Sequence, residues 1–137
     1  MNNVNLNSFI GTESYKKFIT LNPGEGYLRI RAYAASGAIP IKGLKIMVSK
    51  IIDDQNVVFF EGETDESGMI EKIALPAPLT DKDNLLVPEA ATYDILSTYV
   101  PNNAPEKFNV SMYDGICVMQ NISIVPNVGM GREFYGR

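Results

Sequence analysis

The chain has 137 residues, a net charge of −4 and an apolar fraction of 45%. A chain of this length forms one domain and buries enough apolar surface to fold without a metal or a disulfide. The acidic balance, with a pI near 4.8, excludes a nucleic-acid binder, which needs a basic face to meet phosphates. The single cysteine, Cys117, excludes a secreted domain held by intrachain disulfides.

No apolar run approaches the ~18 residues that a membrane-spanning helix needs. Residues 1–5 contain neither the basic nor the apolar region of a signal peptide. We therefore expect synthesis in the cytoplasm, no export by the usual secretory route and no membrane partner.

Residues 1–24 form an asparagine-rich N-terminal arm with scattered large apolar side chains. Thr12 or Ser14 can cap one short helical turn that carries Tyr15, Phe18 and Ile19. Two interpretations stay open: the arm docks on a partner, or it packs on its own domain. Residues 127–137 form a second candidate arm. Six side chains of the two arms are the candidate partner-binding residues: Phe9, Ile10, Tyr15, Phe18, Phe134 and Tyr135.

Residues 25–126 show the two-residue period of β-strands. In the first strand, Leu28 and Ile30 share one face, and Arg29 and Arg31 share the other. Seven strands are predicted, at residues 27–34, 44–52, 57–61, 69–75, 92–99, 107–112 and 116–125. Residues 64–68 form the clearest turn, and Asp114-Gly115 predicts a hairpin between the last two strands. The pattern predicts an all-β, seven-stranded antiparallel Greek-key sandwich with an arm at each end.

Candidate catalytic and metal-binding residues are scarce. The chain has no histidine, which removes histidine-assisted nucleophiles and the common zinc sites. Cys117 lies between apolar neighbours of a predicted strand, where we expect a buried and inert thiol. The acidic pairs Asp53-Asp54 and Asp65-Glu66 fall in turns, and Asp81-Lys82-Asp83-Asn84 lacks the glycine and glutamate of a calcium loop. We predict no metal and no cofactor.

The first strand also presents Tyr27, Arg29, Arg31 and Tyr33 on one face. This stripe can be a binding surface, or it can be the solvent side of an ordinary strand with cross-strand partners. The sequence leaves both interpretations open.

The succession of motifs from residue 26 to residue 125 resembles the transthyretin-like, carboxypeptidase-regulatory-like β-sandwich. The matching pieces are Gly26-Tyr-Leu-Arg-Ile30, Gly37-Ala-Ile-Pro-Ile-Lys-Gly43, Thr64-Asp-Glu-Ser-Gly68, Leu75-Pro-Ala-Pro78, Tyr93-Asp-Ile95 and Asp114-Gly-Ile116, followed by Gln120, Ile122 and Pro126. Within that group the order and spacing are most similar to the N-terminal domain of clostridial spore cortex-lytic enzymes.

The resemblance implies the fold and an accessory or adhesive role beside larger machinery. The cell-wall hydrolase that follows such domains is absent here, so its activity is not implied. The transthyretin-related enzyme that hydrolyses 5-hydroxyisourate uses histidines and a particular C-terminal tetrapeptide. This chain has no histidine and ends Phe134-Tyr-Gly-Arg137, so that activity is not expected.

We therefore expect a non-enzymatic structural subunit of a bacteriophage or phage-tail-like particle: a tail, baseplate or decoration protein made in the bacterial cytoplasm. Its partners would be other structural proteins, in a homo- or hetero-oligomer, bound through the arms. Two alternatives stay open, namely an accessory or targeting module of a cell-wall hydrolase and a carbohydrate-binding module. Under the leading hypothesis, deletion of residues 1–22 leaves a folded sandwich that no longer assembles.

Overall fold

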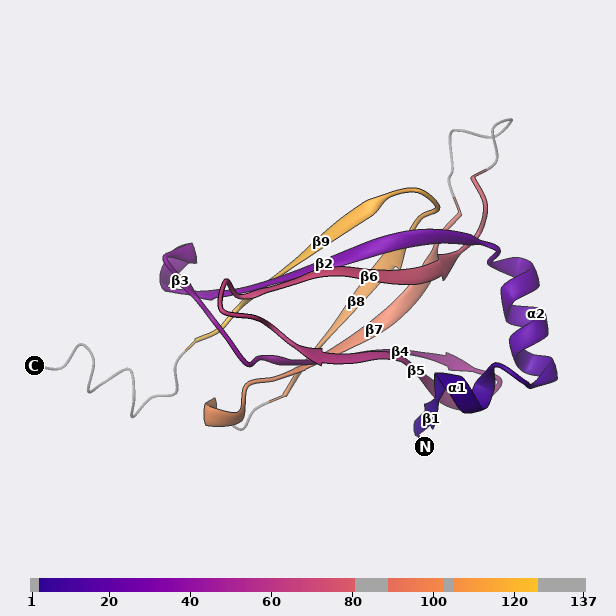
Figure 1. Cartoon of the computed structure of the whole chain (residues 1–137), viewed down its shortest axis with the longest axis horizontal. Coiled ribbons are helices and arrows are strands. Elements are labelled where there is room, and N and C mark those ends of the chain that lie inside the picture. Colours follow the sequence, from indigo (N-terminus) through magenta and orange to yellow (C-terminus); the bar gives the residue numbers. More distant parts are fainter. Residues whose placement is uncertain (1–2, 81–88, 103–104, 126–137) are drawn as a thin grey trace, which may run out of the picture.

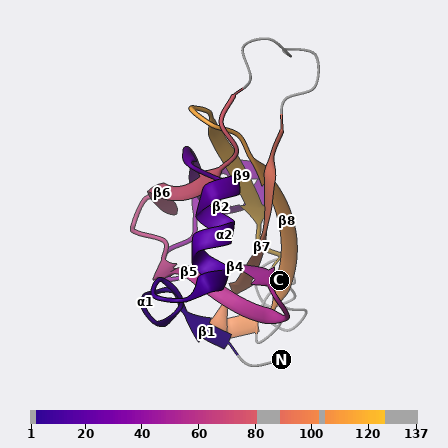
Figure 2. The ribbon, with the colours of Figure 1, turned by 90° about the vertical axis from the view of Figure 1, so that its right-hand side faces the viewer.

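Two β-sheets stacked face to face form the body of the protein (Figures 1 and 2). The computed structural model describes residues 3–80, 89–102 and 105–125. In these ranges the chain forms nine strands, two short α-helices and two 3-10 turns, η1 (Ala35–Gly37) and η2 (Val100–Asn102). The sequence-based prediction of a β-sandwich is therefore confirmed, although the count of seven strands is too low.

Sheet A has five strands in the order β1-β5-β4-β7-β8. Their bounds are β1 (Asn3–Asn5), β5 (Gln55–Glu63), β4 (Lys45–Ile52), β7 (Ala91–Thr98) and β8 (Glu106–Met112). The pairs β5/β4, β4/β7 and β7/β8 are antiparallel, and β1 runs parallel to β5.

Sheet B is built around the long strand β2 (Gly24–Ala34). One edge of β2 pairs antiparallel with β6 (Met69–Ala77) and β3 (Ile39–Pro40). Its second edge pairs with β9 (Cys117–Ser123), which runs parallel to it.

The core lies between the sheets because alternate residues of each strand point inward. On β2 the inward set is Leu28, Ile30 and Ala32, each at most 1% exposed. Sheet A contributes Val48 and Ile95 in the same way, both fully buried. The period of two therefore selects the buried face of each strand, as expected for a half-buried sheet.

Two tight turns follow the local chemistry of their residues. Asp53 and Asp54 both have positive φ, 49° and 64°, and join β4 to β5 in a two-residue hairpin. In the turn between β5 and β6, the Asp65 carboxylate accepts hydrogen bonds from the backbone N–H of Ser67 and of Met69, at 2.9 and 3.0 Å. Gly68 supplies the positive φ of 75° that this turn needs.

The N-terminal segment packs on the sandwich and is not a free arm. It consists of β1, α1 (Leu6–Phe9) and α2 (Glu13–Leu21). Of the two caps that the sequence left open, Thr12 is the one used: it accepts a hydrogen bond from the backbone N–H of Tyr15 at 3.2 Å, and α2 is longer than the single turn expected. Figure 2 shows α2 lying across one end of the two sheets.

The prediction of a β8–β9 hairpin at Asp114-Gly115 is wrong. The chain does turn there, with Gly115 at a φ of 75°, but it crosses from sheet A to sheet B, so that β8 pairs with β7 and β9 with β2. The turn is held against β2: the Asp114 carboxylate accepts from the N–H of Glu25 at 3.1 Å, and the N–H of Gly115 donates to the Glu25 carbonyl at 2.8 Å. The sandwich is consequently mixed rather than wholly antiparallel.

The predicted end of the fourth strand before Pro76 is also wrong. Strand β6 continues through Pro76, which stands opposite Glu25 of β2. Within the described residues β6 pairs on one side only, with β2. An edge strand tolerates proline because the missing N–H can face away from the ladder.

Candidate functional site

The structure removes two of the predicted partner-binding residues from the surface. Phe9 is fully buried and Phe18 is 6% exposed, and both belong to the core of the sandwich. Phe18 packs on Phe59 at 5.7 Å between ring centroids, and Phe59 packs on Tyr93 at 5.2 Å. The interpretation of these two rings as partner contacts is therefore wrong, because α2 inserts Phe18 between the sheets.

The other four predicted residues fall into two groups. Ile10 is 44% exposed, and the half-buried Tyr15 sets its ring edge-on to Phe9 at 6.0 Å. Phe134 and Tyr135 lie outside the described residues. Among the four, only Ile10 presents an exposed apolar side chain in the described ranges.

The prediction that Cys117 is buried is wrong as well. Cys117 is an exposed free cysteine. It pairs with Tyr27 across the β2/β9 ladder, and its neighbour Val118 pairs with the buried Leu28. Val118 therefore points inward and Cys117 outward, while the other apolar neighbour, Ile116, is 51% exposed.

The acidic turn residues have structural partners. Asp65 accepts two backbone hydrogen bonds, and Asp53 accepts one from the Ser14 hydroxyl. Among the residues that the structure describes, no three histidine, cysteine, aspartate or glutamate side chains gather as metal ligands would. The pair Asp81 and Asp83 lies outside the described ranges.

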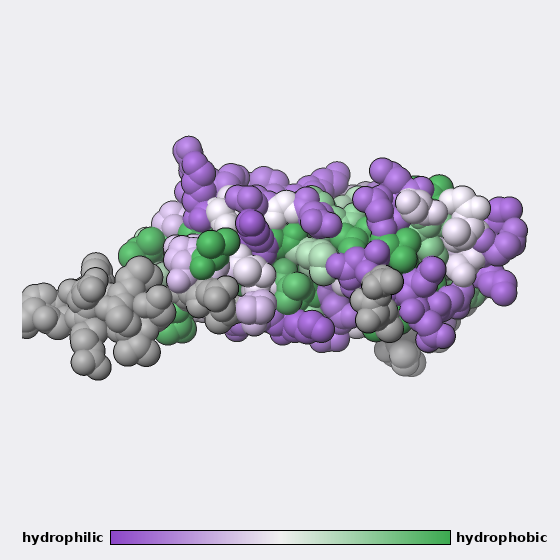
Figure 3. All heavy atoms as spheres, turned by 90° about the horizontal axis from the view of Figure 1, so that it is seen from below, coloured by the Kyte–Doolittle hydropathy of each residue, from purple (hydrophilic) through white to green (hydrophobic). Residues whose placement is uncertain are grey.

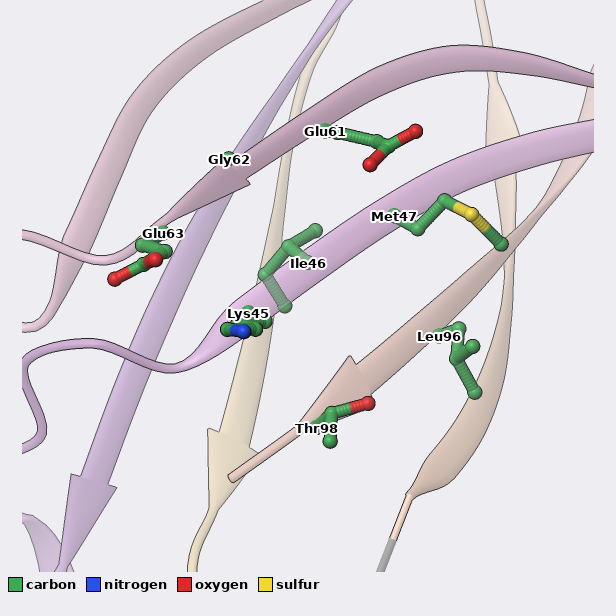
Figure 4. Close-up of a pocket in the computed structure, with 8 residues that line it drawn as sticks. All are labelled: Lys45, Ile46, Met47, Glu61, Gly62, Glu63, Leu96 and Thr98. Carbon is green, nitrogen blue, oxygen red and sulfur yellow. The ribbon is translucent and has the colours of Figure 1, made fainter. Parts of the chain in front are cut away.

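Two adjacent hollows on the outer side of sheet A form the candidate site. One encloses about 350 Å³ and the other about 410 Å³. Both are lined by Met47 of β4 and Leu96 of β7, which stand directly opposite each other in the ladder. Figure 4 shows the first hollow, with these two side chains beside the polar ones around it.

Charged side chains surround the apolar pair, and together they make up what is called face A below. Face A consists of Lys45, Met47 and Ile51 of β4, Glu61 and Glu63 of β5, Asp94, Leu96 and Thr98 of β7, and Lys107 of β8. Seen from below Figure 1, hydrophobic residues gather along the middle of the surface with hydrophilic ones around them (Figure 3). Face A thus has an apolar centre and a charged rim.

Hydrogen bonds hold the polar side chains at the β1 end of face A. The Asn56 amide donates to the Asn3 side chain at 2.7 Å, which ties β1 to β5. Across the sheet, the Asn109 amide donates to the Asp94 carboxylate at 3.2 Å. These bonds hold the polar side chains at this end of face A in place.

The outer side of sheet B has a different character and is called face B below. It consists of Tyr27, Arg29, Arg31 and Tyr33 of β2, Glu71 and Lys72 of β6, and Cys117 and Met119 of β9. The structure confirms that the four residues of β2 share one face and that they have cross-strand partners. Arg29 pairs with Glu71 at 2.9 Å, and Lys72 lies over the Tyr27 ring at 4.5 Å.

Two pKa shifts lie near these faces. The hydrogen bond and the charge of Glu25 raise the pKa of Tyr27, with smaller contributions from burial and from Asp114. Burial lowers the pKa of Lys50, and the charge of Asp94 opposes that shift. Lys50 donates to the Thr92 carbonyl at 2.8 Å and lies 5.4 Å from the Tyr93 ring centroid, so its role is structural.

The sequence contained a weak signal for face A. Met47 and Leu96 occupy outward positions of their strands, between the inward pairs Ile46/Val48 and Ile95/Ser97. Large apolar residues at two outward positions are an exception to the alternation. Only the β4/β7 register shows that the two exceptions are neighbours.

No protein-family model matches the sequence, and no curated protein matches it either. Among solved structures, the chain is similar to 5-hydroxyisourate hydrolase of Klebsiella pneumoniae, with a TM-score of 0.51 and 14% identity. The match covers 74% of this chain and 91% of that one. The chain has the transthyretin-like fold. At this identity the likeness concerns the fold alone, and a particular similarity to spore cortex-lytic enzymes stays a prediction.

Within the described ranges, no helix combines the length and the hydropathy that crossing a bilayer requires.

Proposed function

We propose that this protein is a non-enzymatic structural subunit that binds neighbouring protein subunits of a larger assembly through face A. The observation that carries the proposal is the apolar pair Met47 and Leu96 between two hollows, ringed by charged side chains. Protein interfaces have the same arrangement, with an apolar centre that excludes water and a polar rim. The arms, which the sequence favoured as the binding elements, are replaced in this proposal by a sheet face.

The non-enzymatic part of the proposal is supported by the residue inventory. The chain has no histidine, the side chain best suited to proton transfer near neutral pH. The similar structure is named as a hydrolase, but an identity of 14% transfers no activity. The side chains of the first hollow are mainly lysine, glutamate, methionine, leucine and threonine, held on three strands of one sheet.

The kind of assembly is a finer proposal. We retain a bacteriophage or phage-tail-like particle, which suits a small sandwich of 137 residues with a face suited to protein contact. Such a subunit would work in the particle after synthesis in the bacterial cytoplasm. A hydrolase-targeting module would use the same face on a different partner, so the partner's identity distinguishes the two.

A carbohydrate-binding role is less well supported by the geometry. Sugar rings stack on aromatic faces, and face B does carry Tyr27 and Tyr33. Lys72 lies over the first ring at 4.5 Å and Arg31 over the second at 4.6 Å. The ring faces that a sugar would use are therefore already occupied by cations.

The mass of the native complex tests the proposal. We expect the tagged chain in its source cells to occur in a species many times larger than the 15.1 kDa monomer. Leu96→Lys should shift it to small species, because a charge in the centre of an interface costs several kcal/mol, roughly 2–5. Mass photometry of the affinity-purified material gives both results.

Ser111→Lys is the matched control. Ser111 is an exposed residue of β8 in the same sheet, and it lines neither of the two hollows. The Ser111→Lys variant should leave the large species intact. A wild-type chain that is monomeric in its source cells, or a Leu96→Lys variant that assembles like wild type, would contradict the proposal.

A further inference from the structure

The two outer faces of the sandwich carry opposite excess charge. On face B and at its edge lie three cations, Arg29, Arg31 and Lys72, and two carboxylates, Glu71 and Glu25, the second of which is hydrogen-bonded with Tyr27. Face A has three carboxylates, Glu61, Glu63 and Asp94, and two amines, Lys45 and Lys107. The faces belong to different sheets and point in opposite directions, so they cannot neutralise each other within one molecule.

Two cations of face B lie over aromatic rings and form no ion pair within the described residues. Within the described residues the one ion pair of face B joins Arg29 to Glu71. Arg31 lies over the Tyr33 ring at 4.6 Å and Lys72 over the Tyr27 ring at 4.5 Å. The rings hold both cations at the surface with little freedom, which reduces the entropy lost when an anionic partner binds.

Glu61 and Glu63 supply the matching anions on face A. Neither forms an ion pair within the part of the chain that the structure describes. They stand two residues apart on β5, so their side chains leave the same face about 7 Å apart. Arg29 and Arg31 have the same spacing on β2. Because stacked sheets align their strands within about 30°, two rows of equal period can face each other.

The apolar parts of the two faces also fit. Face A offers Met47 and Leu96 beside hollows of about 350 and 410 Å³. Face B offers Met119, which is 42% exposed. A methionine side chain can enter hollows of this size while the charges pair around it.

We propose that face A binds face B of a second copy of this chain. The inference rests on the proposed function and names the partner of the same site. Because the two faces are different surfaces, each copy keeps one free face after the first contact. Such a head-to-tail contact continues into a ring or a filament, which is the behaviour of a subunit in a repeating assembly.

The expected affinity of the contact between face A and face B follows from the surface area that it buries. Face B limits the contact, because β3 and β6 share one edge of β2 and sheet B is therefore three strands wide. Three strands of about seven residues cover roughly 350 Å², so the contact buries about 700 Å² in total. This lies in the range of weak, transient contacts. Self-association should therefore be reversible and dependent on concentration, and it should weaken between about 0.05 and 0.5 M salt because its charges are partly exposed.

Charge reversal tests the pairing with purified protein in sedimentation velocity runs. The variant Glu61→Lys/Glu63→Lys makes face A basic, and Arg31→Glu/Lys72→Glu makes face B acidic. Each variant alone brings like charges together and should associate at least about tenfold more weakly than wild type. An equimolar mixture of the two should regain association, because each variant's altered face then meets a complementary one.

Glu13→Lys/Glu66→Lys is the control for Glu61→Lys/Glu63→Lys, since it replaces the same two residue types at two exposed positions outside both faces. It should associate like wild type, and circular dichroism should show all variants folded. A mixture that stays monomeric, or single variants that associate like wild type, would overturn the inference.

A purified wild-type chain that stays monomeric at high concentration would also overturn the inference. If Leu96→Lys still dismantled the complex from source cells, face A would bind a different protein. In that case the proposed function would stand without this partner.

Discussion

At the scale of single residues, Tyr93 links the two sheets. Its side chain is fully buried on β7 of sheet A, and its hydroxyl donates to the Pro76 carbonyl on β6 of sheet B at 2.5 Å. Burial raises the pKa of Tyr93 above its ordinary value. Because Tyr93 stays protonated in the folded state at a pH where it ionises in the unfolded chain, the free energy of unfolding decreases as the pH rises above about 10.

We expect Tyr93→Phe to destabilise the protein by about 1–2 kcal/mol at neutral pH, since the Pro76 carbonyl loses its donor. The pKa is raised in the folded state, so the wild-type advantage is complete below the unfolded tyrosine's pKa near 10 and shrinks as the pH rises above it. Lys50 is present in both proteins, so its titration cancels in the comparison. Urea unfolding at pH 7 and at about pH 10.5 measures the difference. An unchanged difference would be evidence against this role.

Alanine substitutions at Gly68 and Gly115 distinguish the energetic cost of backbone strain from that of a steric clash. Both glycines have a φ of 75°. A Cβ on Gly68 would lie 2.4 Å from the Ala32 carbonyl oxygen, whereas a Cβ on Gly115 would have no heavy atom within 4 Å in the described part of the chain. Gly115→Ala should therefore cost about 1 kcal/mol from φ alone, and Gly68→Ala about 3 kcal/mol because the backbone must also move. Thermal unfolding compares them, and equal losses would show that the contact relaxes freely.

At the scale of elements, α2 closes one end of the sandwich. The Thr12 cap sets its start, and its apolar face carries Phe18 into contact with Phe59. The core of the domain therefore includes a residue from the segment that the sequence presented as an arm. Because Phe9 and Phe18 belong to the core, deletion of residues 1–22 should destabilise the sandwich.

Phe18→Ala tests the role of α2 directly. Loss of a buried phenylalanine should lower the free energy of unfolding by about 3–5 kcal/mol. Leu21→Ala in the same helix is the control, since Leu21 is 73% exposed and should change stability by less than about 0.5 kcal/mol. Chemical denaturation gives both values. Similar values for the two variants would mean that α2 detaches in solution and that the N-terminal segment is free to bind a partner.

At the scale of the whole molecule, the two-layer architecture determines how copies can meet. Face A and face B lie on opposite sides of the sandwich, so contact between them is directional. A contact between two copies of face A would be closed and would stop at a dimer. Species larger than dimers should therefore form if face A binds face B, whereas contact between two copies of face A should give only dimers.

Local chemistry was readable from the sequence. The alternation on β2, the Asp53-Asp54 and Asp65-Gly68 turns and the Thr12 cap all appear where the residues predict them. Each depends on φ preferences or hydrogen bonds within a few residues, or on a side-chain period of two. Such terms do not require knowledge of the rest of the chain, so the sequence by itself determined the seven longer strands, these turns and the sandwich class, but not the short strands β1 and β3.

Tertiary structure alone decided which strands pair and which surfaces result. The turn at Asp114-Gly115 reads locally as a hairpin, yet β9 joins β2 because Asp114 and Gly115 bond to Glu25, 89 and 90 residues away in sequence. Met47 and Leu96 become neighbours through the same kind of distant register. Phe18 is buried because it packs on Phe59 of β5, far from it in sequence. These outcomes depend on long-range packing, whose energy is shared among many strands and is not encoded at any one position.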